Sequence, residues 1–257
     1  MSVCSADMNK ERKYKQLVVE RKECNDCEME GMVNPSTLQY DCYEINAWSQ
    51  WQNSLSAKIM LVGQDWGDIE IFKLFKGLDA GTRKNPEGQN STNKTLQNLF
   101  RETFGYELDV PQKAYGKHYS DLFFTNVVLC LKPHEKGRGM SSSLKTRCAV
   151  HCAEKFLKRL VEIIQPQVVI ALGQKAFESI ARSYRLDLKP YSLRKNVGRH
   201  FALDKNENTI LFPIYHCSPE SEHYNNRKMP EQLEDWKRIK DYLKANRDGA
   251  LDCSAAR

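Results

Sequence analysis

The sequence predicts an α/β protein of three layers, in which helices cover both faces of a central, mostly parallel, four-stranded sheet. Four short apolar runs have the composition of buried strands, and segments compatible with helices lie between them. Strands that alternate with helices imply right-handed crossovers, which place neighbouring strands parallel. The four predicted strands span residues 59–62, 122–130, 168–173 and 209–215.

The length of the chain, 257 residues, allows one substantial core. We expect one domain over residues 55–245, preceded by a segment with a Cys-x-x-Cys pair (1–54) and followed by a flexible tail (246–257). The chain lacks a run of about 18 apolar residues. Charged residues follow soon after its start. We therefore expect no membrane span, no secretory signal and a cytoplasmic monomer.

The net charge of +6 suits a polyanionic partner such as DNA without requiring one. Nine cysteines, an odd number in a chain without an export signal, favour free thiols or metal ligands over disulfides. Residues 1–23 are compatible with a helix, and Cys24 and Cys27 follow in a loop-rich stretch. Two thiolates at this spacing can hold one metal ion or one iron of a cluster, although such a pair also occurs as ordinary thiols.

The first predicted strand follows a polar segment, residues 48–58, that favours a helix. The strand stops at Gly63, and Gln64 and Asp65 come directly after it. An open α/β sheet presents functional residues at its carboxyl edge in this way. The alternative is a plain turn, in which Asp65 and Asp68 cap the next segment.

A long surface loop is predicted over the glycine- and asparagine-rich residues 77–93, and a helix over 95–104. The second strand is interrupted by one amide, Asn126. A buried amide needs partners for its carbonyl and its amino group, because leaving either unpaired costs roughly 1 to 3 kcal/mol. Asn126 either bonds neighbouring backbone or recognises a planar ligand edge with one donor and one acceptor, as nucleobases present.

Serines 141–143 can cap a helix that runs to about residue 164 and carries Cys148 and Cys152 on one face. The third strand ends at Gly173, and a helix over 174–184 follows it. His216 comes directly after the fourth strand, and Pro230 opens a final helix that runs to about residue 245.

A parallel sheet brings Asp65, Gly173 and His216 to the same carboxyl edge, with Asn126 close by. Two basic stretches, residues 132–138 and 194–200, either line a track for DNA phosphates or form a solvated surface.

Four segments carry short motifs in this order: 62–67 reads Val-Gly-Gln-Asp-Trp-Gly, 125–133 reads Thr-Asn-Val-Val-Leu-Cys-Leu-Lys-Pro, 169–173 reads Val-Ile-Ala-Leu-Gly, and 216–221 reads His-Cys-Ser-Pro-Glu-Ser. Together they resemble the uracil-DNA glycosylase superfamily, nearest to its iron–sulfur-containing branch. The resemblance implies that family's fold. It also implies hydrolysis of the bond that joins deoxyribose to a flipped uracil or a related deaminated base.

The resemblance also implies roles for the matching residues. His216 would hydrogen-bond the uracil O2 and stabilise the departing anion. Asp65 would orient water and favour the cationic sugar. Asn126 would accept from uracil N3 and donate to O4, which rejects cytosine. The expected substrate-binding residues are Gly63, Gln64, Gly67 and Asn126, and the expected DNA-binding residues are Gly173, Ser218 and Arg227.

Some positions depart from the family pattern. Gly67 stands where the uracil-excising family has a tyrosine that crowds uracil C5, so the exclusion of thymine is in question. Cys217 replaces the proline of the second motif. The candidates for the aromatic that stacks on the base are Phe72 and Phe75, and residues 220–227 would enter the duplex.

The same branch implies a [4Fe-4S] cluster held by Cys24, Cys27, Cys130 and Cys152, with Cys148 as the alternative fourth ligand. Zinc in these positions would serve the same structural end. The remaining alternative is a set of ordinary buried thiols.

Two other functions are compatible with the fold: a non-catalytic binder of nucleic acid or nucleobases, and a different hydrolase on a flavodoxin-like sheet. Asp65 and His216 together argue against the binder, because a binder needs no carboxylate to activate water. The lack of a glycine-rich phosphate-binding motif argues against the other hydrolase.

Overall fold

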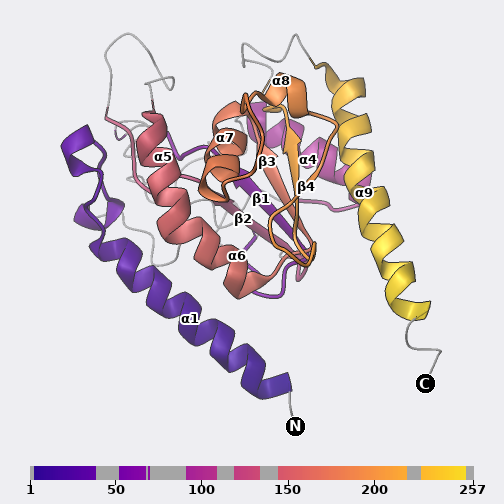
Figure 1. Cartoon of the computed structure of the whole chain (residues 1–257), viewed down its shortest axis with the longest axis horizontal. Coiled ribbons are helices and arrows are strands. Elements are labelled where there is room, and N and C mark those ends of the chain that lie inside the picture. Colours follow the sequence, from indigo (N-terminus) through magenta and orange to yellow (C-terminus); the bar gives the residue numbers. More distant parts are fainter. Residues whose placement is uncertain are drawn as a thin grey trace, which may run out of the picture.

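A five-stranded sheet forms the centre of the structure, a computed structural model (Figure 1). The strands lie in the order β2-β1-β3-β5-β4, and β4 alone runs antiparallel to its neighbour. The mostly parallel sheet is therefore confirmed, but the predicted number of four strands is wrong. The missed strand, β4, is only two residues long, which is too short to give a pattern in the sequence.

The structure describes residues 3–38, 52–67, 69, 91–108, 119–133, 144–218 and 227–252. The strands are β1 (Ile59–Gly63), β2 (Leu122–Asn126), β3 (Val168–Leu172), β4 (Phe201–Ala202) and β5 (Ile210–Ile214). The helices are α1 (Val3–Glu23), η1 (Glu28–Glu30), η2 (Pro35–Thr37), α4 (Ser91–Phe104), α5 (Thr146–Cys152), the π-helical η4 (Ala153–Leu157), α6 (Lys158–Ile164), α7 (Gln174–Ser183), α8 (Leu193–Asn196) and α9 (Met229–Asp252).

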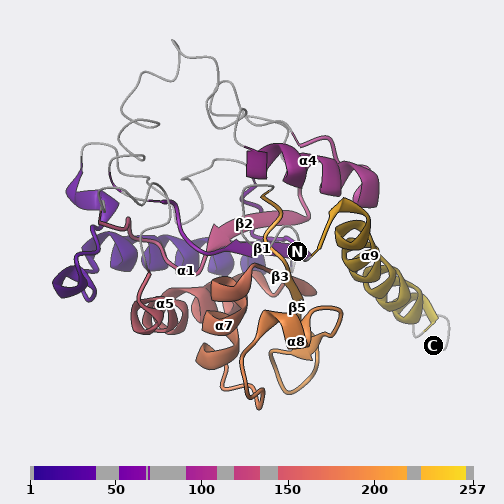
Figure 2. The same cartoon turned by 90° about the horizontal axis from the view of Figure 1, so that it is seen from above.

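Helices cover both faces of the sheet, as predicted. Successive side chains of a strand point to opposite faces, so Met60 packs on one side of β1 and Leu61 on the other. The first face is covered by α1, α5, α6 and α7, and the second by α4 and α9. Figure 2 shows α4 and α9 on one side of the sheet and α1, α5 and α7 on the other.

The N-terminal helix α1 belongs to the same core as the sheet. Its Leu17 is fully buried in the first hydrophobic cluster. On its outer side, Arg159 of α6 donates to both carboxylate oxygens of Glu20. The chain after α1 then reaches the loop beyond β2, where Val33 forms a β-bridge with Leu131. The segment that carries Cys24 and Cys27 is thereby fixed to the rest of the domain.

Three predicted boundaries differ from the structure. Residues 52–58 are not helical, because Ser54 N–H bonds the Leu122 carbonyl and Asn53 forms a bridge with Phe123 beside β2. Strand β2 ends at Asn126 instead of continuing past it. Helix α9 extends to Asp252, beyond the predicted end near residue 245.

Other predictions fall partly outside the described residues: the serine cap at 141–143, Asp68, residues 77–90 of the long loop, residues 134–138, and Phe72 and Phe75. Across the described chain, no helix has both the length and the apolar character needed to span a membrane.

Candidate active site

The carboxyl ends of β1 and β2 meet at Gly63 and Asn126, which are direct partners in the parallel register. A β-carbon at Gly63 would lie 2.3 Å from the side-chain amide of Asn126. Real β-carbons do not approach another atom this closely. Glycine is therefore required here so that the amide can lie against the backbone of the neighbouring strand.

Asn126 is buried, with an exposure of 7%. In the orientation that satisfies both ends of its amide, the nitrogen donates to the Thr125 carbonyl (3.2 Å) and the oxygen accepts from the indole N–H of Trp66 (3.2 Å). These bonds use one of two amide hydrogens and one of two lone pairs. Within the described part of the chain, one amide hydrogen and one carbonyl lone pair of Asn126 have no further partner and are left for a ligand. The neighbouring indole was not predicted as part of the site.

The carboxylate of Asp65 is held from three sides. Its Oδ1 accepts from the backbone N–H of Gly67 (2.8 Å) and lies 3.3 Å from Nζ of Lys132, and its Oδ2 accepts from the Gln64 side chain (2.6 Å). The Asp65–Gly67 bond is the turn contact that a non-catalytic aspartate would also make. Gly67 has a φ of 91°, which favours glycine, and a β-carbon there would meet nothing within 4 Å.

Lys132 was predicted to lie in a basic loop, but the structure buries it. Its side chain is 3% exposed, and that of its partner Asp65 is 6% exposed. Backbone bonds explain the placement, since Lys132 N–H donates to the Gly67 carbonyl (3.1 Å) and Ile69 N–H donates to the Lys132 carbonyl (3.0 Å). The sequence signal was a single lysine directly after the apolar run that ends at Leu131.

His216 lies just after β5 and contacts the end of β3. A β-carbon at Gly173, whose φ is 94°, would lie 3.3 Å from Cβ of His216. The backbone N–H of Ser218 points at Nδ1 of His216 over 3.2 Å. Because a backbone N–H can only donate, Nδ1 is the acceptor, and the neutral ring carries its hydrogen on Nε2.

Burial lowers the pKa of His216 below its ordinary value of 6.5, and the negative charge of Asp65 offsets this shift in part. The neutral imidazole is therefore the favoured form at neutral pH. The structure thus brings together a carboxylate, a neutral imidazole with an Nε2 donor, and a buried amide at the carboxyl edge of one sheet.

Two predicted DNA contacts have internal partners. Arg227 forms an ion pair with Asp235 at the start of α9, in which its Nε lies 2.8 Å from Oδ2. Ser218 is buried, with an exposure of 6%, and orients His216 as described above. Contacts of Gly173, Ser218 and Arg227 with DNA stay predictions, and residues 219–226 lie outside the described part of the chain.

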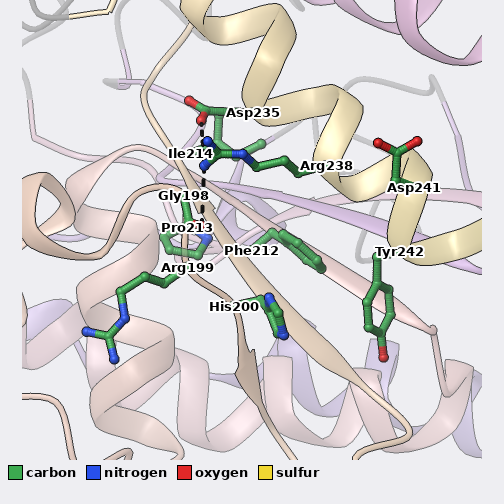
Figure 3. A pocket seen from close by; sticks show the side chains of 10 residues that line it. All are labelled: Gly198, Arg199, His200, Phe212, Pro213, Ile214, Asp235, Arg238, Asp241 and Tyr242. Atoms are coloured by element: carbon green, nitrogen blue, oxygen red, sulfur yellow. Dashed lines mark hydrogen bonds and ion pairs between the residues drawn. The ribbon is translucent and has the colours of Figure 1, made fainter. Parts of the chain in front are cut away.

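The second basic stretch, residues 194–200, contributes to a separate cavity of about 310 Å³ at the β4 edge of the sheet (Figure 3). His200 stacks on Phe212 with ring centroids 5.5 Å apart, and Arg238 donates to the Gly198 carbonyl (3.3 Å). Neither Asp65 nor His216 lines this cavity. Its lining combines the aromatic side chains of Phe212 and Tyr242 with four charged residues: Arg199, Asp235, Arg238 and Asp241.

A third group of residues consists of free cysteines that line one cavity beneath the loop after β2: Cys24, Cys27, Cys130, Cys148 and Cys152. Burial raises the pKa values of Cys27 and Cys130 to about 12, and it also raises the pKa of Cys152. The structure does not decide between Cys148 and Cys152, because both line the cavity. Within the described residues, no group of three or more His, Cys, Asp or Glu side chains is arranged to hold a metal ion.

Two cationic side chains face these thiols. Lys155 donates to the sulfur of Cys24 (3.4 Å) and to Asp26 (2.8 Å). Arg21, which is 2% exposed, lines the cavity, and its charge acts against burial by lowering the pKa of Cys130. Positive charge beside buried sulfur favours thiolate, the form that binds metal.

Comparison with known proteins gave one family. Residues 51–240, most of the chain, match the family model described as the uracil DNA glycosylase superfamily. The match includes Gly63, Asp65, Asn126 and His216, whereas Cys24 and Cys27 precede it. No curated protein matches the chain.

Proposed function

The chain belongs to the uracil DNA glycosylase superfamily, and on that premise we propose that it hydrolyses the N-glycosidic bond of uracil, or of a related deaminated base, in DNA. The observation that supports this most is the neutral imidazole of His216 beside the carboxylate of Asp65. Cleavage leaves negative charge on the base and positive charge on the sugar, and these two groups suit the two charges. We propose that the protein acts on DNA as a cytoplasmic monomer.

His216 would stabilise the departing base. A neutral ring with its hydrogen on Nε2 donates to the uracil O2, where negative charge develops as the bond breaks. Donors that are already oriented toward such a developing anion are an effective means of transition-state stabilisation. The bond from Ser218 N–H to Nδ1 fixes the donor on Nε2 before the substrate arrives.

Asp65 would act on the other side of the bond. As an anion it favours the cationic sugar, and it orients the water that attacks C1′. Asn126 would read the base, with its remaining carbonyl lone pair accepting from N3–H and its remaining amide hydrogen donating to O4. Cytosine presents an acceptor at N3 and a donor at N4, so both contacts would be lost and cytosine would be rejected.

Gly67 supports a pocket that is open near the uracil C5 position. A β-carbon at this position would meet nothing within 4 Å, which supports open space directly beside Gly67. Discrimination between uracil and thymine would then depend on other parts of the pocket.

We also infer that the cysteine cavity holds a metal centre, a [4Fe-4S] cluster on Cys24, Cys27, Cys130 and either Cys152 or Cys148, with zinc as the alternative. The residue types support this, because five thiols and Arg21 line one cavity and Lys155 donates to the sulfur of Cys24. When bound, the centre would link the loop after α1 to the loop after β2 and to α5. Its contribution would be to stability and not to the chemistry of the base.

A non-catalytic nucleobase binder is the second candidate. It is favoured by the three internal partners of Asp65, since a carboxylate held by Gly67, Gln64 and Lys132 resembles the anchor of a turn. A binder would keep its affinity for uracil-containing DNA without any cleavage.

The test is alkaline cleavage of a labelled oligonucleotide with one uracil, incubated with the parent protein, Asp65→Asn or His216→Ala. Matched controls are Asp187→Asn and His200→Ala, which change exposed residues outside the candidate site. The proposal expects cleavage by the parent and by both controls, with large losses in the two site variants. Uracil-DNA binding without cleavage by a folded parent would favour the binder, and neither binding nor cleavage would reject both.

A further inference from the structure

A buried lysine lies against the carboxylate that the proposed reaction uses. Nζ of Lys132 is 3.3 Å from Oδ1 of Asp65, and the two side chains are 3% and 6% exposed. Removing one partner of such a pair leaves an uncompensated buried charge, which a carboxylate can relieve by taking up a proton. Lys132 is thus the buried positive charge in contact with the Asp65 carboxylate.

The two carboxylate oxygens of Asp65 also have different partners. Oδ1 is bound by the Gly67 N–H and by the side chain of Lys132, and the backbone N–H of Lys132 donates to the Gly67 carbonyl. Among the residues that the structure describes, Oδ2 is bound only by the side chain of Gln64, which is partly exposed. A side-chain amide can rotate away when a ligand arrives, whereas a backbone N–H cannot. Oδ2 is therefore the oxygen that can be offered to water.

We propose that Lys132 is a positioning residue that keeps Asp65 ionised and directs its Oδ2 toward the attacking water. This inference rests on the proposed glycosylase function and names a residue that supports it. The charged or titratable groups that face Asp65 in the described part of the chain are Lys132, from the loop after β2, and His216, from the loop after β5. Since His216 is neutral at neutral pH, Lys132 supplies the positive charge.

The lysine also has a cost, because its positive charge opposes the cationic sugar in the transition state. The increase in cleavage rate that Lys132 provides should then depend on pH. Lys132 is needed where Asp65 would otherwise be protonated, and it is dispensable at a pH high enough to keep the carboxylate ionised alone. A purely structural lysine would show no such dependence.

The first experiment compares single-turnover cleavage of uracil-containing DNA from pH 5 to 9 by the parent, Lys132→Met, Lys132→Arg and the exposed control Lys205→Met. We expect the acidic limb of the Lys132→Met profile to move to higher pH. One pH unit of movement lowers the rate on that limb about tenfold. The rates should converge with the parent near pH 9, and Lys132→Arg should restore most of the lost rate. An equal loss at every pH, no loss, or failure of arginine to restore the rate would overturn the inference.

A second measurement does not depend on cleavage. The melting temperature of Lys132→Met should be below that of the parent at neutral pH and should approach it on acidification, as Asp65 takes up a proton. The double variant Lys132→Met/Asp65→Asn should lack this dependence. If the parent does not cleave uracil-DNA, the proposed function fails while the melting data still test the coupling between Lys132 and Asp65. If the parent cleaves and Lys132→Met behaves like it, only the present inference fails.

Discussion

The backbone N–H of Ser218 donates to Nδ1 of His216 over 3.2 Å and so determines which ring nitrogen carries the hydrogen. The bond is local, because the two residues are only two positions apart in the loop after β5. A protonated ring would place its own Nδ1–H against this N–H. Burial disfavours the charged ring as well. Two independent features thus keep His216 neutral.

We predict that glycosylase activity persists below the pH range in which an exposed histidine becomes charged. The pKa of His216 is lowered from 6.5 by burial, so the neutral form survives to a lower pH than in the unfolded chain. The rate of base excision by the parent should therefore stay level down to pH 6.5 and fall only below it. A rate profile with its acidic midpoint at or above 6.5 would contradict this.

The lowered pKa of His216 also predicts that the stability of the fold depends on pH. The unfolded chain takes up a proton on this histidine at a higher pH than the folded protein does, so folding is progressively disfavoured as the pH falls below 6.5. Melting temperatures of the parent and of His216→Asn should therefore differ in slope between pH 6.5 and 5, with the flatter dependence in the variant. Parallel slopes would show that His216 does not titrate differently in the folded protein.

Gly63→Ala is expected to damage both stability and substrate recognition. The added methyl group would lie 2.3 Å from the Asn126 amide, and relieving such an overlap typically costs about 1–3 kcal/mol. Chemical denaturation measures the loss of unfolding free energy. The double variant Gly63→Ala/Asn126→Ala removes the overlap, so it should be more stable than Gly63→Ala while still failing to select uracil over cytosine. Equal stability of the two variants would contradict the close contact.

The ion pair between Glu20 and Arg159 should hold α1 to α6 in a pH-dependent manner. The hydrogen bond from Arg159 lowers the pKa of Glu20 from 4.5 to about 2. Its stabilising contribution is then fully present above 4.5 and is lost as the pH falls toward 2. Because both side chains are about a third exposed, we expect a difference of under about 1 kcal/mol between the parent and Glu20→Gln at pH 7, and a smaller difference near pH 2. Thermal unfolding at both pH values measures it.

Metal analysis of purified protein tests the cysteine cavity. We expect iron in the parent and a loss of most of it in Cys24→Ser and Cys130→Ser, because a missing thiolate opens the centre. Of Cys148→Ser and Cys152→Ser, the variant that loses iron identifies the fourth ligand. Cys217→Ser is the matched control, since Cys217 is also buried but lies outside this cavity. Zinc in place of iron would support the alternative centre, and no bound metal would indicate ordinary thiols.

The core of the fold and the position of the candidate site were accessible from the sequence, because both depend on local patterns. Buried strands of four or five apolar residues are visible as runs, and Asp65 and His216 follow them directly. Other features depend on contacts between distant segments. The stretch at 52–58 pairs with β2, which its own composition does not show. The burial of Lys132 depends on backbone bonds to Gly67 and Ile69, and an isolated lysine before a basic loop resembles surface.

Three residues with chemically different roles lie within the short stretch from Asn126 to Lys132. Asn126 faces the base in the proposed reaction, Cys130 lines the cysteine cavity, and Lys132 balances the charge of Asp65. The backbone here is anchored to the loop after β1 on one side and to Val33 on the other. A disturbance of the sulfur atoms, such as oxidation of Cys130, would therefore be transmitted along the backbone to the amide and the ammonium group. Oxidation of Cys130 should thus reduce the selection of the base as well as the stability of the protein.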